Sequence, residues 1–95
     1  MTEFLLELYA SKADCAAVGA GLERLHAAAA ELTDEQRRVE VLRSIFVPED
    51  ETCFFLVEAG SAEDVRETAR RASVVCERVV EATEEPFTHE RSTAR

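Results

Sequence analysis

The sequence predicts an α+β fold whose elements follow the order strand, helix, strand, strand, helix, strand. Three observations predict it. Segments 3–9, 39–47, 52–59 and 78–82 are rich in β-branched, aromatic or alternating apolar residues, which is typical of strands. Segment 11–32 has apolar side chains at spacings of three and four, which is typical of a helix packed on one side. Ser61, followed three positions later by Asp64, indicates the start of a second helix.

The first strand, residues 3–9, is apolar on both sides. Side chains on one side are Phe4, Leu6 and Leu8, and those on the other are Leu5, Glu7 and Tyr9. A sheet with one wet side does not need apolar residues on both. We therefore expect helices to cover one side and something else to cover the other.

The first helix is expected over residues 11–32, opened by a capping box of Ser11 and Asp14. Its apolar stripe consists of Cys15, Val18, Leu22, Leu25, Ala29 and Leu32. Thr33 resembles a further N-terminal cap, which predicts a separate short helical turn through Arg38.

Residues 39–47 and 52–59 are predicted to form an antiparallel hairpin around a turn that begins at Pro48. Strict alternation in the first of these strands places Val39, Val41, Arg43, Ile45 and Val47 on one side and Leu42, Ser44 and Phe46 on the other. In the second strand, Cys53, Phe55 and Val57 oppose Phe54, Leu56 and Glu58.

The second helix is expected to end near Ala72, with Val65, Ala69 and Ala72 inward and a Glu67–Arg71 pair at i,i+4 on the outside. The last strand, residues 78–82, completes a single domain over residues 1–82. Residues 83–95 are polar and lack periodicity, so we expect a C-terminal tail.

This order is that of the ferredoxin-like βαββαβ fold, in which two right-handed crossovers place both helices on one face of a four-stranded antiparallel sheet. The opposite sheet face is then left open. Because this face is also apolar, the simplest closure is a homodimer with the two open sheet faces together, which is a dimeric α+β barrel.

The charge restricts the possible partners. The 95-residue chain carries 20 acidic and 11 basic residues, a net charge of -9. Nucleic acids and anionic membranes select for clustered Lys and Arg, so we expect neither as a partner. We recognise no signal peptide and no apolar run of about 18–20 residues, and Cys15, Cys53 and Cys76 form no C-x-x-C motif. These features predict a reduced, cytoplasmic protein.

Five segments resemble a family of small ferredoxin-like proteins of mostly unknown function that includes nickel-binding members. They are FLLE at 4–7, VLRS at 41–44, DETCFFLVEA at 50–59, AEDVRETARRA at 62–72 and ERVVE at 77–81. The resemblance spans residues 3–82 and implies a dimeric α+β barrel. It departs from the family at Ser73 and Val75, where a Gly and a Pro are usual.

Nickel-binding members of that family use several histidines, whereas this chain has two. The candidate metal ligands are His26 and His89. Nickel favours imidazole ligands, and two histidines far apart in sequence make a poor site within one chain. The sequence therefore leaves the cofactor unknown and favours none over nickel, although a dimer doubles the number of histidines.

The candidate site residues are Glu7, Tyr9, His26, Arg43 and Ser44. His26 lies about 60° from the centre of the apolar stripe, where it could reach a pocket between helix and sheet and carry a proton near neutral pH. Glu7 is expected to pair with Arg43 or to lie at the rim of its face. Ser44 beside Arg43 could bind an anion.

Three functions remain open from the sequence. The first is a small dimeric α+β barrel protein of unassigned activity that binds a small ligand or a metal such as nickel. The second is a cofactor-independent enzyme, similar to monooxygenases or polyketide cyclases, with His26 and Tyr9 as catalytic residues; it requires both to border one cavity. The third is an acidic subunit that binds a basic protein partner. We find no nucleophile elbow, phosphate loop or dinucleotide motif that would select a reaction.

Overall fold

The computed structural model describes residues 1–11, 13 and 15–83. Its elements are β1 (Thr2–Tyr9), α1 (Cys15–Asp34), β2 (Val39–Val47), the 3-10 turn η1 (Pro48–Asp50), β3 (Thr52–Ala59), α2 (Ala62–Arg71) and β4 (Arg78–Ala82). The strands form one antiparallel sheet in the order β2-β3-β1-β4. The predicted ferredoxin-like α+β fold is therefore confirmed. Of the predicted tail, 83–95, all but Thr83 lies outside the described residues.

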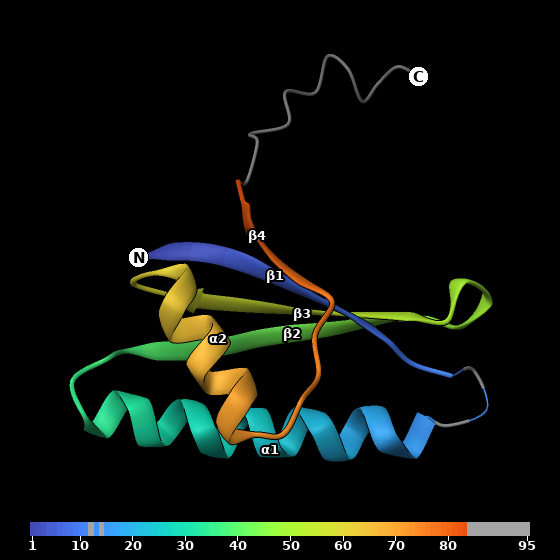
Figure 1. The fold of residues 1–95 in the computed structure, drawn as a ribbon, viewed down its shortest axis with the longest axis horizontal. Coiled ribbons are helices and arrows are strands. Elements are labelled where there is room, and N and C mark those ends of the chain that lie inside the picture. The colour runs from blue at the N-terminus through green and yellow to red at the C-terminus, as the bar shows by residue number, and fades with distance from the viewer. Residues whose placement is uncertain (12, 14, 84–95) are drawn as a thin grey trace.

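Both helices pack against the side of the sheet that carries Phe4 and Leu6. The central strands β1 and β3 are paired so that Leu6 lies opposite Phe55 and Phe4 opposite Val57. All four join one buried cluster with Leu25 and Leu32 of α1 and Val65 and Ala69 of α2. Each Val, Leu or Phe side chain of this cluster stabilises the fold by about 1.5–3 kcal/mol when fully buried. Figure 1 shows α1 running along the sheet and the end of α2 reaching α1 near the middle of α1.

The start of α2 is set by Ser61, as its sequence predicts. The Ser61 hydroxyl accepts a hydrogen bond from the backbone N–H of Asp64 at 3.2 Å. Val65, Ala69 and Ala72 are buried as expected. Thr68 is also buried on this helix. Its hydroxyl donates a hydrogen bond to the carbonyl of Asp64 at 2.7 Å, so this buried polar group has a partner.

The separate helical turn predicted from Thr33 is wrong. Helix α1 instead continues to Asp34, and the chain then turns through Gln36, whose φ is 69°. The Thr33 hydroxyl donates to the carbonyl of Val39 at 3.2 Å and accepts from its N–H at 3.1 Å. Thr33 therefore ties the end of α1 to the start of β2 rather than opening a new helix.

The side-chain assignment along β2 is also wrong beyond Val41. The register with β3 shifts between Val41 and Arg43, so Leu42 is an extra residue in a β-bulge. Because one inserted residue reverses the alternation, the two sets of side chains exchange sides after the bulge. Val39 and Val41 face the helices together with Ser44 and Phe46, whereas Arg43, Ile45 and Val47 lie on the opposite side.

No helix among residues 1–11, 13 and 15–83 is long and apolar enough to cross a bilayer.

Candidate functional site

The side of the sheet away from the helices, here called the open face, collects most of the predicted site residues. Cross-strand pairing arranges it in rows, each read from β2 through β3 and β1 to β4. From one end to the other the rows are Glu40, Glu58, Glu3 and Ala82; Arg43, Leu56, Leu5 and Val80; Ile45, Phe54, Glu7 and Arg78; and Val47, Thr52 and Tyr9.

An apolar patch occupies the middle of the open face. It consists of Leu5, Ile45, Val47, Phe54, Leu56 and Val80. Ile45 is 46% exposed and the other five are half-buried. The described residues thus leave this patch accessible to water, and contiguous apolar surface of this kind marks interaction sites.

Three carboxylates form one end of the open face, here called the acidic row: Glu3, Glu40 and Glu58. Glu58 lies directly opposite Glu40 on one side and Glu3 on the other. Like charges in such positions destabilise a sheet. The Arg38–Glu40 ion pair, at 3.5 Å between exposed side chains, relieves this only weakly. A hollow of about 300 Å³ at this end is lined by Glu3, Glu58 and Glu81, among others.

Glu7 pairs with Arg78 rather than with Arg43. The Arg78 Nε donates to Glu7 Oε1 at 2.7 Å, and the two residues are cross-strand neighbours on β1 and β4. Arg43 instead lies opposite Leu56 and remains exposed. The predicted alternative of a Glu7–Arg43 pair is therefore wrong, because the bulge and the strand order set different neighbours.

The predicted site residues divide between the two sides of the sheet. Glu7, Tyr9 and Arg43 lie on the open face, whereas Ser44 lies opposite Phe55 on the helix side. His26 is exposed on α1, which packs against the helix side through Leu25. The five candidates therefore do not form one site.

The cavity at Tyr9 does not include His26. It measures about 240 Å³ and is lined by Leu8, Tyr9, Ala10, Ser11, Ala17 and Val18. The Tyr9 hydroxyl donates instead to Glu51 Oε1 at 3.4 Å, at the exposed end of the sheet. The enzyme interpretation requires His26 and Tyr9 to border one cavity, and this cavity borders Tyr9 without His26.

The described residues do not provide a metal centre within one copy. No group of three or more His, Cys, Asp or Glu side chains in this part of the chain is placed to hold a metal ion. His26 is exposed on α1, and His89 lies outside the described residues. A nickel ion prefers imidazole ligands, and the described residues of one copy do not bring several imidazoles together.

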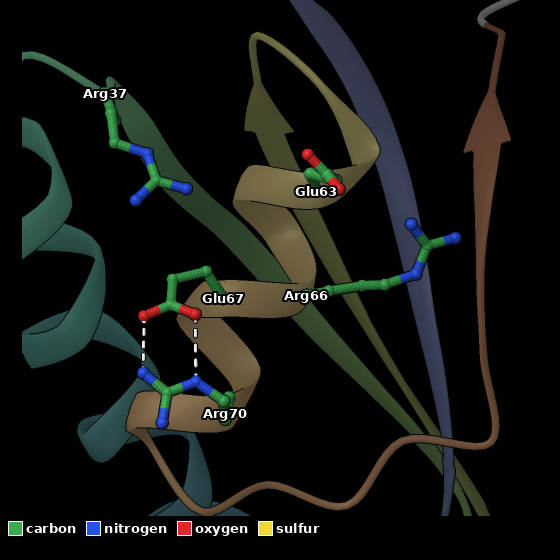
Figure 2. Close-up of a pocket in the computed structure, with 5 residues that line it drawn as sticks. All are labelled: Arg37, Glu63, Arg66, Glu67 and Arg70. Atoms are coloured by element: carbon green, nitrogen blue, oxygen red, sulfur yellow. Dashed lines mark hydrogen bonds and ion pairs between the residues drawn. The ribbon is translucent and has the colours of Figure 1, made fainter.

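A second hollow, of about 360 Å³, lies over α2 and is lined by Arg37, Glu63, Arg66, Glu67 and Arg70. Figure 2 shows Glu67 paired with Arg70, while Arg66 points away from them. Arg70 donates twice to Glu67, at 2.9 and 2.6 Å. Arg37 pairs with Asp64 at 2.8 Å. Because carboxylates of the same chain already pair with Arg37 and Arg70, the hollow has little positive charge left to bind an anion.

The same charges tie the two helices together. Arg71 donates to Glu67 at 2.8 Å, as the i,i+4 spacing predicts, and to Glu35, the residue just after α1, at 2.8 and 3.0 Å. Hydrogen bonds from Arg70 and then Arg71 lower the pKa of Glu67 to about 2. Bonds to Glu35 and Glu67 raise the pKa of Arg71. The sequence indicated the Glu67–Arg71 pair, but the Glu35 contact depends on how the helices pack.

Comparison with known proteins identifies the family. Residues 11–82 match the model of a family described as nickel responsive protein SCO4226-like. The crystal structure of SCO4226 from Streptomyces coelicolor A3(2) superposes with a TM-score of 0.72 and 16% identity, covering 88% of this chain and 99% of that one. At that identity the match supports the fold alone. No curated protein matches. The family match spans most of the chain and agrees with the resemblance seen in the sequence, so this chain belongs to the SCO4226-like family of nickel responsive proteins.

Proposed function

We propose that this chain is a small, non-catalytic binding protein whose working unit is a homodimer closed through the open face. The proposal rests on the apolar patch of the open face, where Ile45 is 46% exposed. The other side of the same sheet is well packed against the helices. A second copy offers the same patch, so two copies bury it reciprocally. The apolar interior between the two sheets is a suitable environment for a small apolar ligand.

Two features support a binding role over catalysis or metal chemistry. Tyr9 lines a cavity with Ala17 and Val18 of α1, and His26, which is exposed farther along that helix, does not line it. Nickel binding is not part of the proposal, because the described residues assemble no three-donor group. A cytoplasmic location stays a prediction from the sequence.

The charge defines what must drive assembly. Each chain carries -9, so a dimer carries twice that, -18. Association therefore works against long-range repulsion and must come from apolar burial. Because salt screens the repulsion and leaves apolar burial intact, high salt should not dissociate the dimer.

A pair of matched variants tests the proposal. Ile45→Asp places a charge in the patch, whereas Val75→Asp places the same charge on an 86% exposed valine between α2 and β4. We expect light scattering at micromolar concentration to give a dimer for the natural protein and Val75→Asp, and a monomer for Ile45→Asp. A natural protein that stays monomeric, or an Ile45→Asp variant that stays dimeric, would contradict the proposal.

A further inference from the structure

The charged residues of the open face are incompletely paired within one copy. Arg78 is the partner of Glu7 at 2.7 Å, and Arg38 contacts Glu40 at 3.5 Å. Among the described residues, no ion pair or hydrogen bond involves the side chains of Glu3, Glu58 or Arg43. Two carboxylates and one guanidinium on the same face are thus left to water.

When a second molecule covers this face, its unpaired charges lose their contact with water. A charge that loses water without gaining a partner is strongly unfavourable at an interface. Glu3 and Glu58 belong to the acidic row, where each already has a like-charged neighbour. The acidic row therefore needs a cation when the face is covered, and Arg43 is the unpaired cation that the face provides.

Pairing within one copy does not meet this need in the structure. Arg43 lies opposite Leu56, so Glu58 is its diagonal neighbour two residues farther along β3. Diagonal positions are about 7–8 Å apart, which a long side chain could bridge, yet Arg43 remains exposed and makes no such contact. A two-fold dimer offers the other solution, because any contact between Arg43 and the partner's acidic row occurs twice.

We infer that Arg43 of one copy is the counter-ion for the acidic row, at Glu58 or Glu3, of a second copy. This inference rests on the proposed homodimer and adds to it the residues that select the partner's orientation. The apolar patch then supplies the drive to associate, while the reciprocal ion pairs determine how the two faces are matched.

Charge-reversed variants mixed in solution test the pairing. Arg43→Glu, Glu58→Arg and Glu3→Arg are each prepared alone, and circular dichroism checks that each folds. We expect Arg43→Glu and at least one of the acidic-row variants to raise the dimer dissociation constant about tenfold, measured by sedimentation at low salt. Arg66→Glu is the matched control, because Arg66 is exposed on α2 away from the open face and its reversal changes the net charge equally.

Mixing distinguishes contacts between copies from contacts within one. A heterodimer of Arg43→Glu with Glu58→Arg places opposite charges together at both junctions if the pair crosses between copies. If the pair forms within a copy, each half of that heterodimer keeps two like charges. Random mixing of equal amounts already gives twice as much heterodimer as either homodimer. We expect native mass spectrometry to show a heterodimer share clearly above that, for the Glu58→Arg or the Glu3→Arg mixture.

The outcomes separate this inference from the proposed function. A natural protein that remains monomeric overturns both. A dimer in which neither mixture favours the heterodimer overturns the inference alone, and so does an Arg43→Glu variant that dimerises as well as Arg66→Glu.

Discussion

The two faces of the sheet are built from the same strands and similar side chains, yet they differ in what covers them. Phe54 and Phe55 are adjacent on β3, and Phe55 is 1% exposed beneath the helices whereas Phe54 lies half-buried on the open face. Leu5 and Leu6 of β1 divide in the same way. Apolar side chains are thus present on both faces, and the position of the helices determines which of them form the core.

The largest expected effect comes from breaking the covered face. Phe55→Ala should lower the free energy of unfolding by about 3–5 kcal/mol, because it leaves a cavity among close-packed side chains. Phe54→Ala should cost about 1 kcal/mol when measured by denaturant at protein concentrations where the chain is monomeric. If Phe55→Ala does not fold, Phe55→Leu against Phe54→Leu makes the same comparison. Equal losses at the two positions would show that the faces are not distinct.

A smaller effect is expected at the border of the helix layer. The pKa of Glu67 lies at about 2 because Arg70 and then Arg71 bond to its carboxylate, against a value of 4.5 without such partners. A lowered pKa means that Glu67 stabilises the fold fully above about pH 4.5, and that this contribution is lost as pH falls towards 2. We expect the melting temperature of the natural protein to fall across that range.

Two variants test whether Glu67 causes this fall in melting temperature. In Glu67→Gln the fall between pH 4.5 and 2 should be shallower, because the titrating group has been removed. Glu23→Gln, at an exposed position on α1, should follow the natural protein. A Glu67→Gln profile parallel to that of the natural protein would show that the pairs with Arg70 and Arg71 add no stability.

The smallest expected effect is that of nickel. No group of three or more His, Cys, Asp or Glu side chains among the described residues is placed to hold a metal ion, so adding Ni²⁺ to the protein should leave the melting temperature unchanged and release no heat in a titration. A clear shift that disappears in His26→Ala or His89→Ala would contradict this expectation and identify a ligand.

Much of the fold was predictable because it depends on local patterns. The order of elements, the two-sided strand 3–9 and the cap at Ser61 all follow from spacing and turn chemistry, and the structure confirms them. The bulge at Leu42 was not predictable in the same way. Its effect appears only when β2 is paired with β3, since a single extra residue exchanges the sides of Arg43 and Ser44.

The candidate site was less predictable than the fold. The open face was anticipated from apolar residues on both sides of the strands, and Glu7 and Tyr9 were placed on it correctly. The partner of Glu7 was not, because Arg78 is 71 residues away and reaches Glu7 only through the pairing of β4 with β1. The acidic row was likewise missed, since its three glutamates come from three different strands.

By itself the sequence determined the elements, the acidic charge and the presence of apolar side chains on both sides of the sheet, because these depend on composition and short-range periodicity. The tertiary structure alone decided which residues of the other strands share that open face, and with it that Arg43 lies there with the acidic row. Strand order and register bring distant residues together, and no short-range pattern encodes which distant residues those are.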